Sequence, residues 1–118
     1  HQNKTGALIQ CACELGAVCS DANTKQREAI HQYGKSIGLM FQIVDDLIDL
    51  NGSKEHVGKA TRKDSDAGKT TYPSVLGEEA SKTAIEELKK QADNALDVLG
   101  DDAETLRSFN LWLAQRTR

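Results

Sequence analysis

The chain has little that would commit it to an oxidising compartment or to nucleic acid. It has one proline, five aromatic residues and three cysteines among 118 residues. The cysteines are odd in number and gathered at positions 11, 13 and 19, which argues against a disulfide framework and favours a reducing compartment. No basic block is present and the net charge is −3, so nucleic acid is a poor candidate partner. We therefore expect a cytoplasmic protein.

Long hydrophobic runs are also missing. The nearly apolar stretches 7–18 and 39–44 are much shorter than the ~18 to 20 residues that cross a bilayer. The start lacks the charged segment and apolar core of a signal peptide, so we expect no membrane association. The length allows one domain or part of one, and a start at His1 is compatible with a piece of a longer chain.

The residues that are present favour helices. Ala, Leu, Glu, Lys and Gln are abundant, and hardly any run alternates as a strand would, so we predict an all-α fold. Apolar periodicity and end signals predict helices over 7–20, 25–50, 80–99 and from 102 onward, with a short helix at Pro73. Asn51-Gly52 is expected to end the second helix, and the aperiodic stretch 53–71 is expected to be a functional loop.

Three expectations concern burial. The 7–20 segment is apolar almost all round, which predicts a helix covered on most sides. Cys11 and Cys13 are then expected to be core thiols. Trp112 is expected to lie in the core with Phe109 and Leu113.

Four polar side chains near the end of the 25–50 helix share one face. At about 100° per residue they fall within an arc about 100° wide: Gln42, Asp45, Asp46 and Asp49. Neighbouring carboxylates on a helix repel each other. Either a hard divalent cation such as Mg²⁺ neutralises them, or they form an acidic face exposed to solvent. Gly34 and Gly38 lie above the carboxylates, which indicates that a ligand or another helix needs the space.

Positive charge follows the carboxylates directly. The loop carries five basic residues: Lys54, Lys59, Arg62, Lys63 and Lys69. A glycine precedes both Lys59 and Lys69, which would let the backbone approach a phosphate. Carboxylates with a metal on one side and lysines on the other predict a phosphate site, unless the lysines only balance the acidic residues of the same loop. Lys4 and Thr5, ahead of the first apolar helix, are a further candidate for anion binding.

Taken in order, these segments resemble the C-terminal portion of the trans-isoprenyl diphosphate synthases, in particular the bacterial short-chain enzymes of the farnesyl diphosphate synthase type. The segments that carry the resemblance are Lys4-Thr5-Gly6-Ala7-Leu8, Phe41 to Asp49, Gly58-Lys59, Asp64, Gly68 to Pro73 and Gln115-Arg116. The resemblance covers nearly the whole chain. It implies the C-terminal part of an isoprenoid-synthase helical bundle around a central cavity.

The resemblance also implies a reaction. It is the Mg²⁺-dependent, head-to-tail condensation of isopentenyl diphosphate with dimethylallyl or geranyl diphosphate, giving a short-chain product such as farnesyl diphosphate. Asp45, Asp46 and Asp49 match the family's second aspartate-rich motif, which binds Mg²⁺. The positions that match those around the allylic diphosphate are Lys4, Thr5, Gln42, Lys59 and Lys69. By the same resemblance, the catalytic roles fall to Asp45, Asp46, Lys4 and Lys59.

Residues 1–118 are expected to be the C-terminal part of a single polyprenyl synthetase domain, because the family's first aspartate-rich motif and isopentenyl diphosphate site have no counterpart here. We expect the N-terminal half of the same enzyme as a partner, a homodimer, and no activity from these residues alone. Without that half, Ile37, Val44, Ile48 and much of the 7–18 helix should be exposed. The alternative is a non-catalytic helical partner or regulatory subunit of a prenyl synthase.

Overall fold

The computed structural model describes residues 2–55 and 77–116. Its elements are α1 (Gln2–Cys19), α2 (Thr24–Glu55), α5 (Glu78–Ala95), η1 (Leu96–Ala103) and α6 (Glu104–Ala114). Both described ranges are helical and contain no strand, which confirms the all-α prediction. The helix expected at Pro73 and most of the predicted loop lie outside the described residues. No helix within the described ranges is long and apolar enough to cross a membrane.

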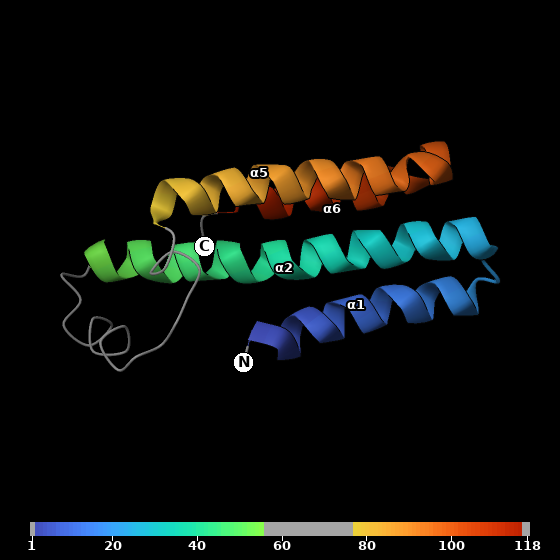
Figure 1. The fold of residues 1–118 in the computed structure, drawn as a ribbon, viewed down its shortest axis with the longest axis horizontal. Helices are drawn as coiled ribbons and strands as arrows, with labels where there is room; N and C mark the ends of the chain where they lie inside the picture. Colours follow the sequence, from blue (N-terminus) through green and yellow to red (C-terminus); the bar gives the residue numbers. More distant parts are fainter. Residues whose placement is uncertain (1, 56–76, 117–118) are drawn as a thin grey trace.

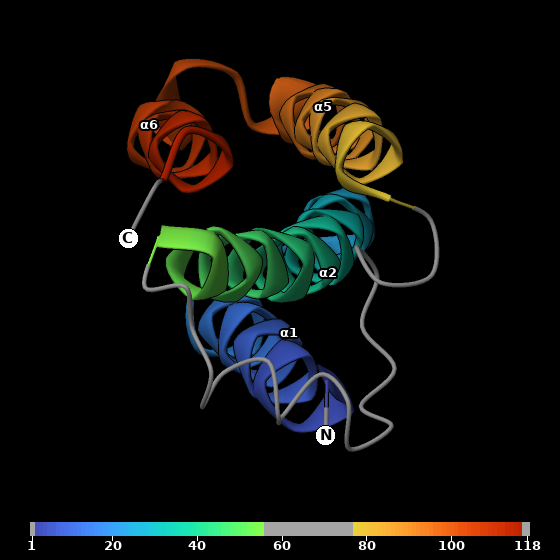
Figure 2. The ribbon, with the colours of Figure 1, turned by 90° about the vertical axis from the view of Figure 1, so that its left-hand side faces the viewer.

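Helix α2 is the centre of the arrangement. Seen end-on in Figure 2, α1 lies on one side of α2, while α5 and α6 lie together on the other. Figure 1 shows that all four run nearly lengthwise, and the molecule measures 50 × 22 × 20 Å. The core lies mainly between α2 and the α5–α6 side, and its largest fully buried apolar side chains are Tyr33, Met40, Ile43, Leu96 and Leu113.

Helix α2 begins at a reciprocal pair of hydrogen bonds. The backbone N–H of Gln26 donates to Asn23 Oδ1, and the backbone N–H of Asn23 donates to Gln26 Oε1, both at 2.9 Å. This capping box satisfies N–H groups that the first turn of the helix leaves without partners. The predicted stop at Asn51-Gly52 is wrong, because α2 continues to Glu55. A helical glycine costs only about 1 kcal/mol relative to alanine, which the continuing helix tolerates.

Helices α1 and α2 run antiparallel and touch through glycines. A Cβ atom added to Gly38 would come within 2.9 Å of the Gly6 carbonyl oxygen, and one added to Gly34 would come within 3.1 Å of Cys13 Cβ. Of the two explanations offered by the sequence for these glycines, the close helix is therefore the observed one. Farther along, His31 Nδ1 pairs with Glu14 Oε1, and Gln10 Nε2 lies 3.4 Å from the same ring nitrogen.

Helices α5 and α6 are joined through η1 (Leu96–Ala103), in which the chain changes direction at Gly100. The backbone of Gly100 has φ 60° and ψ −139°, a conformation that L side chains rarely adopt, so the helix predicted to stop there does change direction at that residue. Its last turns are tightened into η1. Buried Asn110 then fastens α6 to α5, because its Nδ2 donates to the Lys89 carbonyl at 3.0 Å and to Asp93 Oδ1 at 2.9 Å.

Several burial predictions are wrong. Ile37 and Val44 are 3% and 2% exposed because the α5–α6 side covers them. Trp112 is 56% exposed and lies beside Phe109, their ring centroids 5.8 Å apart, at the surface of α6. Leu113 is buried as predicted, and the other buried side chain of α6 is Asn110.

Helix α1 is not covered on most sides. Leu8, Leu15 and Val18 are 69%, 60% and 54% exposed, and Cys11 is exposed as well. We call these four residues the α1 apolar face. Cys13 alone of the two predicted core thiols is half-buried, and the three cysteines are free thiols. Exposure of much of the 7–18 segment agrees with the expectation for a chain without a covering half.

Candidate functional site

The aspartate motif lies on the last third of α2, where the helix changes from buried to accessible. Ile43, Val44 and Leu47 face the core, whereas Gln42, Asp45 and Asp46 are half-buried and Asp49 is exposed. The side chain of Asp45 is 44% exposed. Successive turns of one helix thus offer carboxylates on the accessible flank, while the opposite flank anchors the helix.

A basic side chain from the far end of the chain reaches this segment. Arg116 Nη2 lies 3.6 Å from Asp45 Oδ1, and the Arg116 guanidinium lies 5.4 Å from the ring centroid of Phe41. Phe41 and Asp45 are one helical turn apart, so one guanidinium contacts both. The sequence offered Gln115-Arg116 only as part of a resemblance. No local pattern could have paired Arg116 with Asp45, because the pairing depends on how α6 packs against α2.

The start of α1 lies toward the same part of α2. Gly6 meets Gly38, and the helices are antiparallel, so stepping back from Gly6 to Lys4 moves toward Gln42 on α2 (Figure 1). Lys4 is exposed and Thr5 is half-buried. Among the predicted site residues, the structure therefore brings the Lys4–Thr5 turn and the Gln42–Asp49 segment to one region. Lys59 and Lys69 lie outside the described residues.

The donor set suits Mg²⁺ only in partnership with a ligand. Within residues 2–55 and 77–116, no group of three or more His, Cys, Asp or Glu side chains is placed to hold a metal ion. Mg²⁺ usually takes one or two protein carboxylates and completes its coordination with water and substrate phosphate. Accessible carboxylates on successive turns fit that mode of binding and do not form a closed cage.

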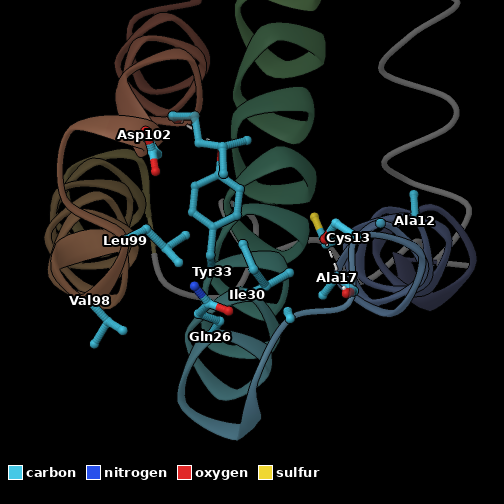
Figure 3. Close-up of a pocket in the computed structure, with 13 residues that line it drawn as sticks. Ala12, Cys13, Ala17, Gln26, Ile30, Tyr33, Val98, Leu99 and Asp102 are labelled. Atoms are coloured by element: carbon cyan, nitrogen blue, oxygen red, sulfur yellow. Dashed lines mark hydrogen bonds between the residues drawn. The ribbon is translucent and has the colours of Figure 1, made fainter.

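A separate pocket lies at the other end of α2, as Figure 3 shows. It measures about 780 Å³ and opens between α1 and η1, with Gln26, Ile30 and Tyr33 of α2 as its floor. Tyr33 is 1% exposed and its hydroxyl donates to the Leu106 carbonyl at 2.9 Å. Burial raises the pKa of Tyr33 well above its usual range, with smaller contributions from Cys13 and Asp93.

The thiol of Cys13 lines the same pocket. Burial, and secondarily the charge of Glu14, raises the pKa of Cys13 above its ordinary value. A thiol with a raised pKa is less often a thiolate at neutral pH and is a poor nucleophile. The pocket therefore has no activated group at Cys13 or Tyr33.

Comparison with known proteins agrees with the helical fold and the resemblance. The family model described as Polyprenyl synthetase matches residues 1–106. The chain belongs to the polyprenyl synthetase family.

Individual relatives include plant and bacterial enzymes. The chain is 43% identical over 96 residues to a chloroplastic geranylfarnesyl diphosphate synthase of Leucosceptrum canum, covering 81% of this chain and 26% of that one. It is 41% identical over 102 residues to geranylgeranyl pyrophosphate synthase 4 of Arabidopsis thaliana, covering 86% and 27%. The chain thus spans about a quarter of the length of these relatives.

A solved structure shares the fold. The crystal structure of an FPP/GFPP synthase from Zymomonas mobilis in its apo form superposes with a TM-score of 0.78 at 36% identity. The match covers 95% of this chain and 35% of the bacterial enzyme. The predicted likeness to part of an isoprenoid-synthase bundle is confirmed.

Proposed function

We propose that this chain forms the diphosphate-handling part of a trans-prenyltransferase that condenses isopentenyl diphosphate with an allylic diphosphate. One observation carries the proposal. Accessible carboxylates on α2 lie beyond the Gly38–Gly6 contact, in the direction of the Lys4–Thr5 end of α1, in a chain that belongs to the polyprenyl synthetase family. Positive and negative groups that face one region suit a diphosphate with its cation.

In the proposed reaction the allylic C–O bond breaks and its electron pair leaves with the diphosphate. The double bond of isopentenyl diphosphate then attacks the allylic cation, a new C–C bond forms, and a proton is lost. Bound Mg²⁺ would stabilise the negative charge that develops on the leaving diphosphate. Asp45, Asp46 and Asp49 are the residues that would hold it.

The other residues of the site have separate tasks in this proposal. Lys4 supplies a positive charge, and the Thr5 hydroxyl and the Gln42 amide donate hydrogen bonds to diphosphate oxygens. Lys59 and Lys69 would approach the same group from the loop after α2. Groups fixed in advance on helices cost little reorganisation when the charge develops, and this is the usual source of the largest catalytic effect.

Product length, assembly and location are part of the proposal. The relatives named above are geranylgeranyl, geranylfarnesyl and FPP/GFPP synthases, so farnesyl diphosphate is one product among longer ones to be assayed. Isopentenyl diphosphate would bind to residues supplied by the N-terminal half of the enzyme, which would also cover the α1 apolar face. A homodimer and a cytoplasmic location stay predictions.

The test uses the complete polypeptide that carries this sequence. It is assayed with Mg²⁺, labelled isopentenyl diphosphate, and dimethylallyl, geranyl or farnesyl diphosphate, and the products are separated by chain length. We expect turnover that falls by about a hundredfold or more in Asp45→Asn, the scale of losing one charge-stabilising group. Asp97→Asn is the matched control, because Asp97 lies on η1 and pairs with Arg107 at 2.9 Å.

The regulatory-subunit alternative predicts a different result. The polypeptide would turn over none of the three allylic diphosphates but would bind an active prenyl synthase and change its rate. The exposed α1 apolar face is the observation that favours this alternative. Turnover by the purified polypeptide alone excludes it.

A further inference from the structure

The contact between Arg116 and the aspartate motif joins two helices that differ in role. Arg116 follows α6, two residues after its last residue, Ala114. Its backbone N–H donates to the Leu113 carbonyl at 3.2 Å, so the residue continues the end of α6. The side chain is 20% exposed and Asp45 is 44% exposed, so solvent screens this ion pair less than a pair in open water.

We propose that Arg116 is the resting counter-ion of Asp45, and that a divalent cation bound at Asp45 releases the C-terminal end of α6 from α2. The inference rests on the proposed function, because it needs Asp45 to bind the cation. A guanidinium 3.6 Å from Asp45 Oδ1 competes with the cation for the same carboxylate. A guanidinium and a cation bound to the same carboxylate also repel each other, so binding both at once costs free energy.

The fold gives Arg116 somewhere to go. A pocket of about 430 Å³ lies between α2, α5 and the end of α6, and Arg116 is one of its lining residues. The same pocket is lined by Glu86, which offers a second carboxylate, by Lys82, whose Nζ lies 3.6 Å from Glu78 Oε2, and by Ala114 and Gln115 of the segment that would move. Arg116 can therefore leave Asp45 without being driven through the packed core.

Phe41 makes the resting position specific. A planar guanidinium over an aromatic face gains a cation–π contact that adds to the ion pair. The centroid distance of 5.4 Å is within the range of such contacts. Asp45 and the ring of Phe41 together hold Arg116, at the end of α6, in one place until a cation binds the carboxylate.

The test measures Mn²⁺ binding to the complete polypeptide by electron paramagnetic resonance in the presence of inorganic diphosphate, with the protein-free Mn²⁺–diphosphate complex as the reference. Arg116→Gln removes the charge but keeps a long polar side chain over Phe41. We expect this variant to bind Mn²⁺ about two- to fivefold more tightly than wild type, the range of a partly exposed ion pair. Arg107→Gln is the matched control, because it removes the same charge from α6 at a contact with Asp97, and its Mn²⁺ affinity should equal that of wild type.

A second readout follows the helix end. Hydrogen exchange of the peptide covering residues 104–116 should rise in wild type when Mn²⁺ is added. In Arg116→Gln it should be high from the start and unresponsive to Mn²⁺. Should Arg116→Gln fail to fold, Arg116→Lys keeps the charge with a poorer stacking surface, and its affinity should lie between wild type and the tighter value.

The outcomes separate this inference from the proposed function. Wild-type Mn²⁺ binding that Asp45→Asn abolishes, together with an Arg116→Gln affinity equal to or weaker than wild type, overturns the counter-ion role and leaves the metal site standing. Absence of Mn²⁺ binding in every variant overturns both. Tighter binding in Arg116→Gln alone, with exchange that no longer responds to the metal, supports the inference.

Discussion

At the scale of single residues, Tyr33 is the side chain whose chemistry depends most on burial. Its ring is nearly inaccessible and its hydroxyl is committed to the Leu106 carbonyl. An ionised phenolate there would lose both water and the hydrogen bond it donates. The protonated form is therefore favoured in the folded chain, and the pKa of Tyr33 is raised.

A dependence of stability on alkaline pH follows. The ordinary tyrosine pKa is 10.0, so above about pH 10 the unfolded chain releases the Tyr33 proton while the folded chain keeps it. The folded state then binds more protons than the unfolded state, and the free energy of unfolding falls by up to about 1.4 kcal/mol per pH unit from this group. Below pH 10 the contribution is fully present.

Tyr33→Phe isolates this effect. We expect the variant to lose about 0.5 to 1.5 kcal/mol at neutral pH with the hydrogen bond, and to show a shallower decline of stability above pH 10 than wild type. Urea unfolding of both proteins between pH 8 and about 11 measures it. If the free energy of unfolding declined with pH equally in wild type and Tyr33→Phe, the pKa of Tyr33 would be the same in the folded and unfolded chain, contrary to this prediction.

Individual site residues were predictable only where one helix sets their relation. The grouping of Gln42 with the three aspartates follows from helical geometry alone, and α2 is indeed continuous through them. The position of Trp112 was predicted wrongly, because its helix turns Asn110 inward to satisfy the Lys89 carbonyl and Asp93. Apolar periodicity does not register a buried amide of this kind.

At the scale of elements, the crossing of α1 over α2 is fixed by the absence of side chains. Gly38 lies against the backbone of Gly6, and no flexible side chain lies between them that could move aside. A small residue at such a crossing sets both the distance and the direction in which α1 runs. That direction in turn determines where Lys4 and Thr5 lie relative to the aspartates.

Gly38→Ala should therefore be costly although alanine favours helices. The added Cβ meets the Gly6 carbonyl oxygen at 2.9 Å, so α1 has to shift, and we expect a loss of about 1 to 3 kcal/mol in the free energy of unfolding. Gly52→Ala is the matched control in the same helix. A Cβ at Gly52 meets nothing within 4 Å, so this variant should gain up to about 1 kcal/mol.

Thermal unfolding followed by circular dichroism compares the two variants. Opposite signs are the expected result, because both gain the same helix propensity and only one meets another backbone. Equal stabilisation of both variants would contradict a tight α1–α2 crossing.

The helices themselves were largely predictable, and their ends were less so. Strong apolar periodicity predicted α2, and the interruption predicted between residues 99 and 102 contains Gly100, where the backbone does leave the helical conformation. The helix end predicted at Asn51-Gly52 was wrong, because the cost of a glycine inside a helix is only about 1 kcal/mol and a helix that is already formed can continue through it. The partner of Gly34 and Gly38 could not be chosen from the sequence, since a ligand and a helix make the same demand for space.

At the scale of the whole molecule, one side of the bundle is unfinished. The radius of gyration is 15.9 Å, larger than the about 13 to 14 Å of a compact domain of this length. The α1 apolar face lies on the outside of α1, which covers α2 but has no helix beyond it in the described part of the chain (Figure 2). Exposed apolar patches of this kind mark a surface that another element covers.

Isolated residues 1–118 should accordingly self-associate. We expect Leu15→Glu, which places a charge in the middle of the α1 apolar face, to reduce that association, because Leu15 is 60% exposed. Gln91→Glu adds the same charge at an exposed position of α5 and should leave association unchanged. Sedimentation velocity over a range of concentrations measures both variants against the wild-type chain.

In the complete polypeptide the same substitution should instead lower stability, because the face would be covered there. A wild-type chain of residues 1–118 that is folded and monomeric at every concentration would count against a missing cover. It would favour the alternative of a non-catalytic helical partner of a prenyl synthase.

The short turn between α1 and α2 has a consequence for how the chain reaches its structure. These helices are joined by residues 20–23, whereas the Tyr33 hydroxyl and the Leu106 carbonyl are 73 positions apart. Closing a short loop costs less chain entropy, so the α1–α2 hairpin can form early and the docking of α5 and α6 comes later. On the ribosome the hairpin also emerges before α5 and α6. Until α5 and α6 dock, Ile37, Met40 and Val44 lack the α5–α6 side chains that pack against them in the folded chain, so this strip of α2 is the apolar surface that the hairpin leaves exposed.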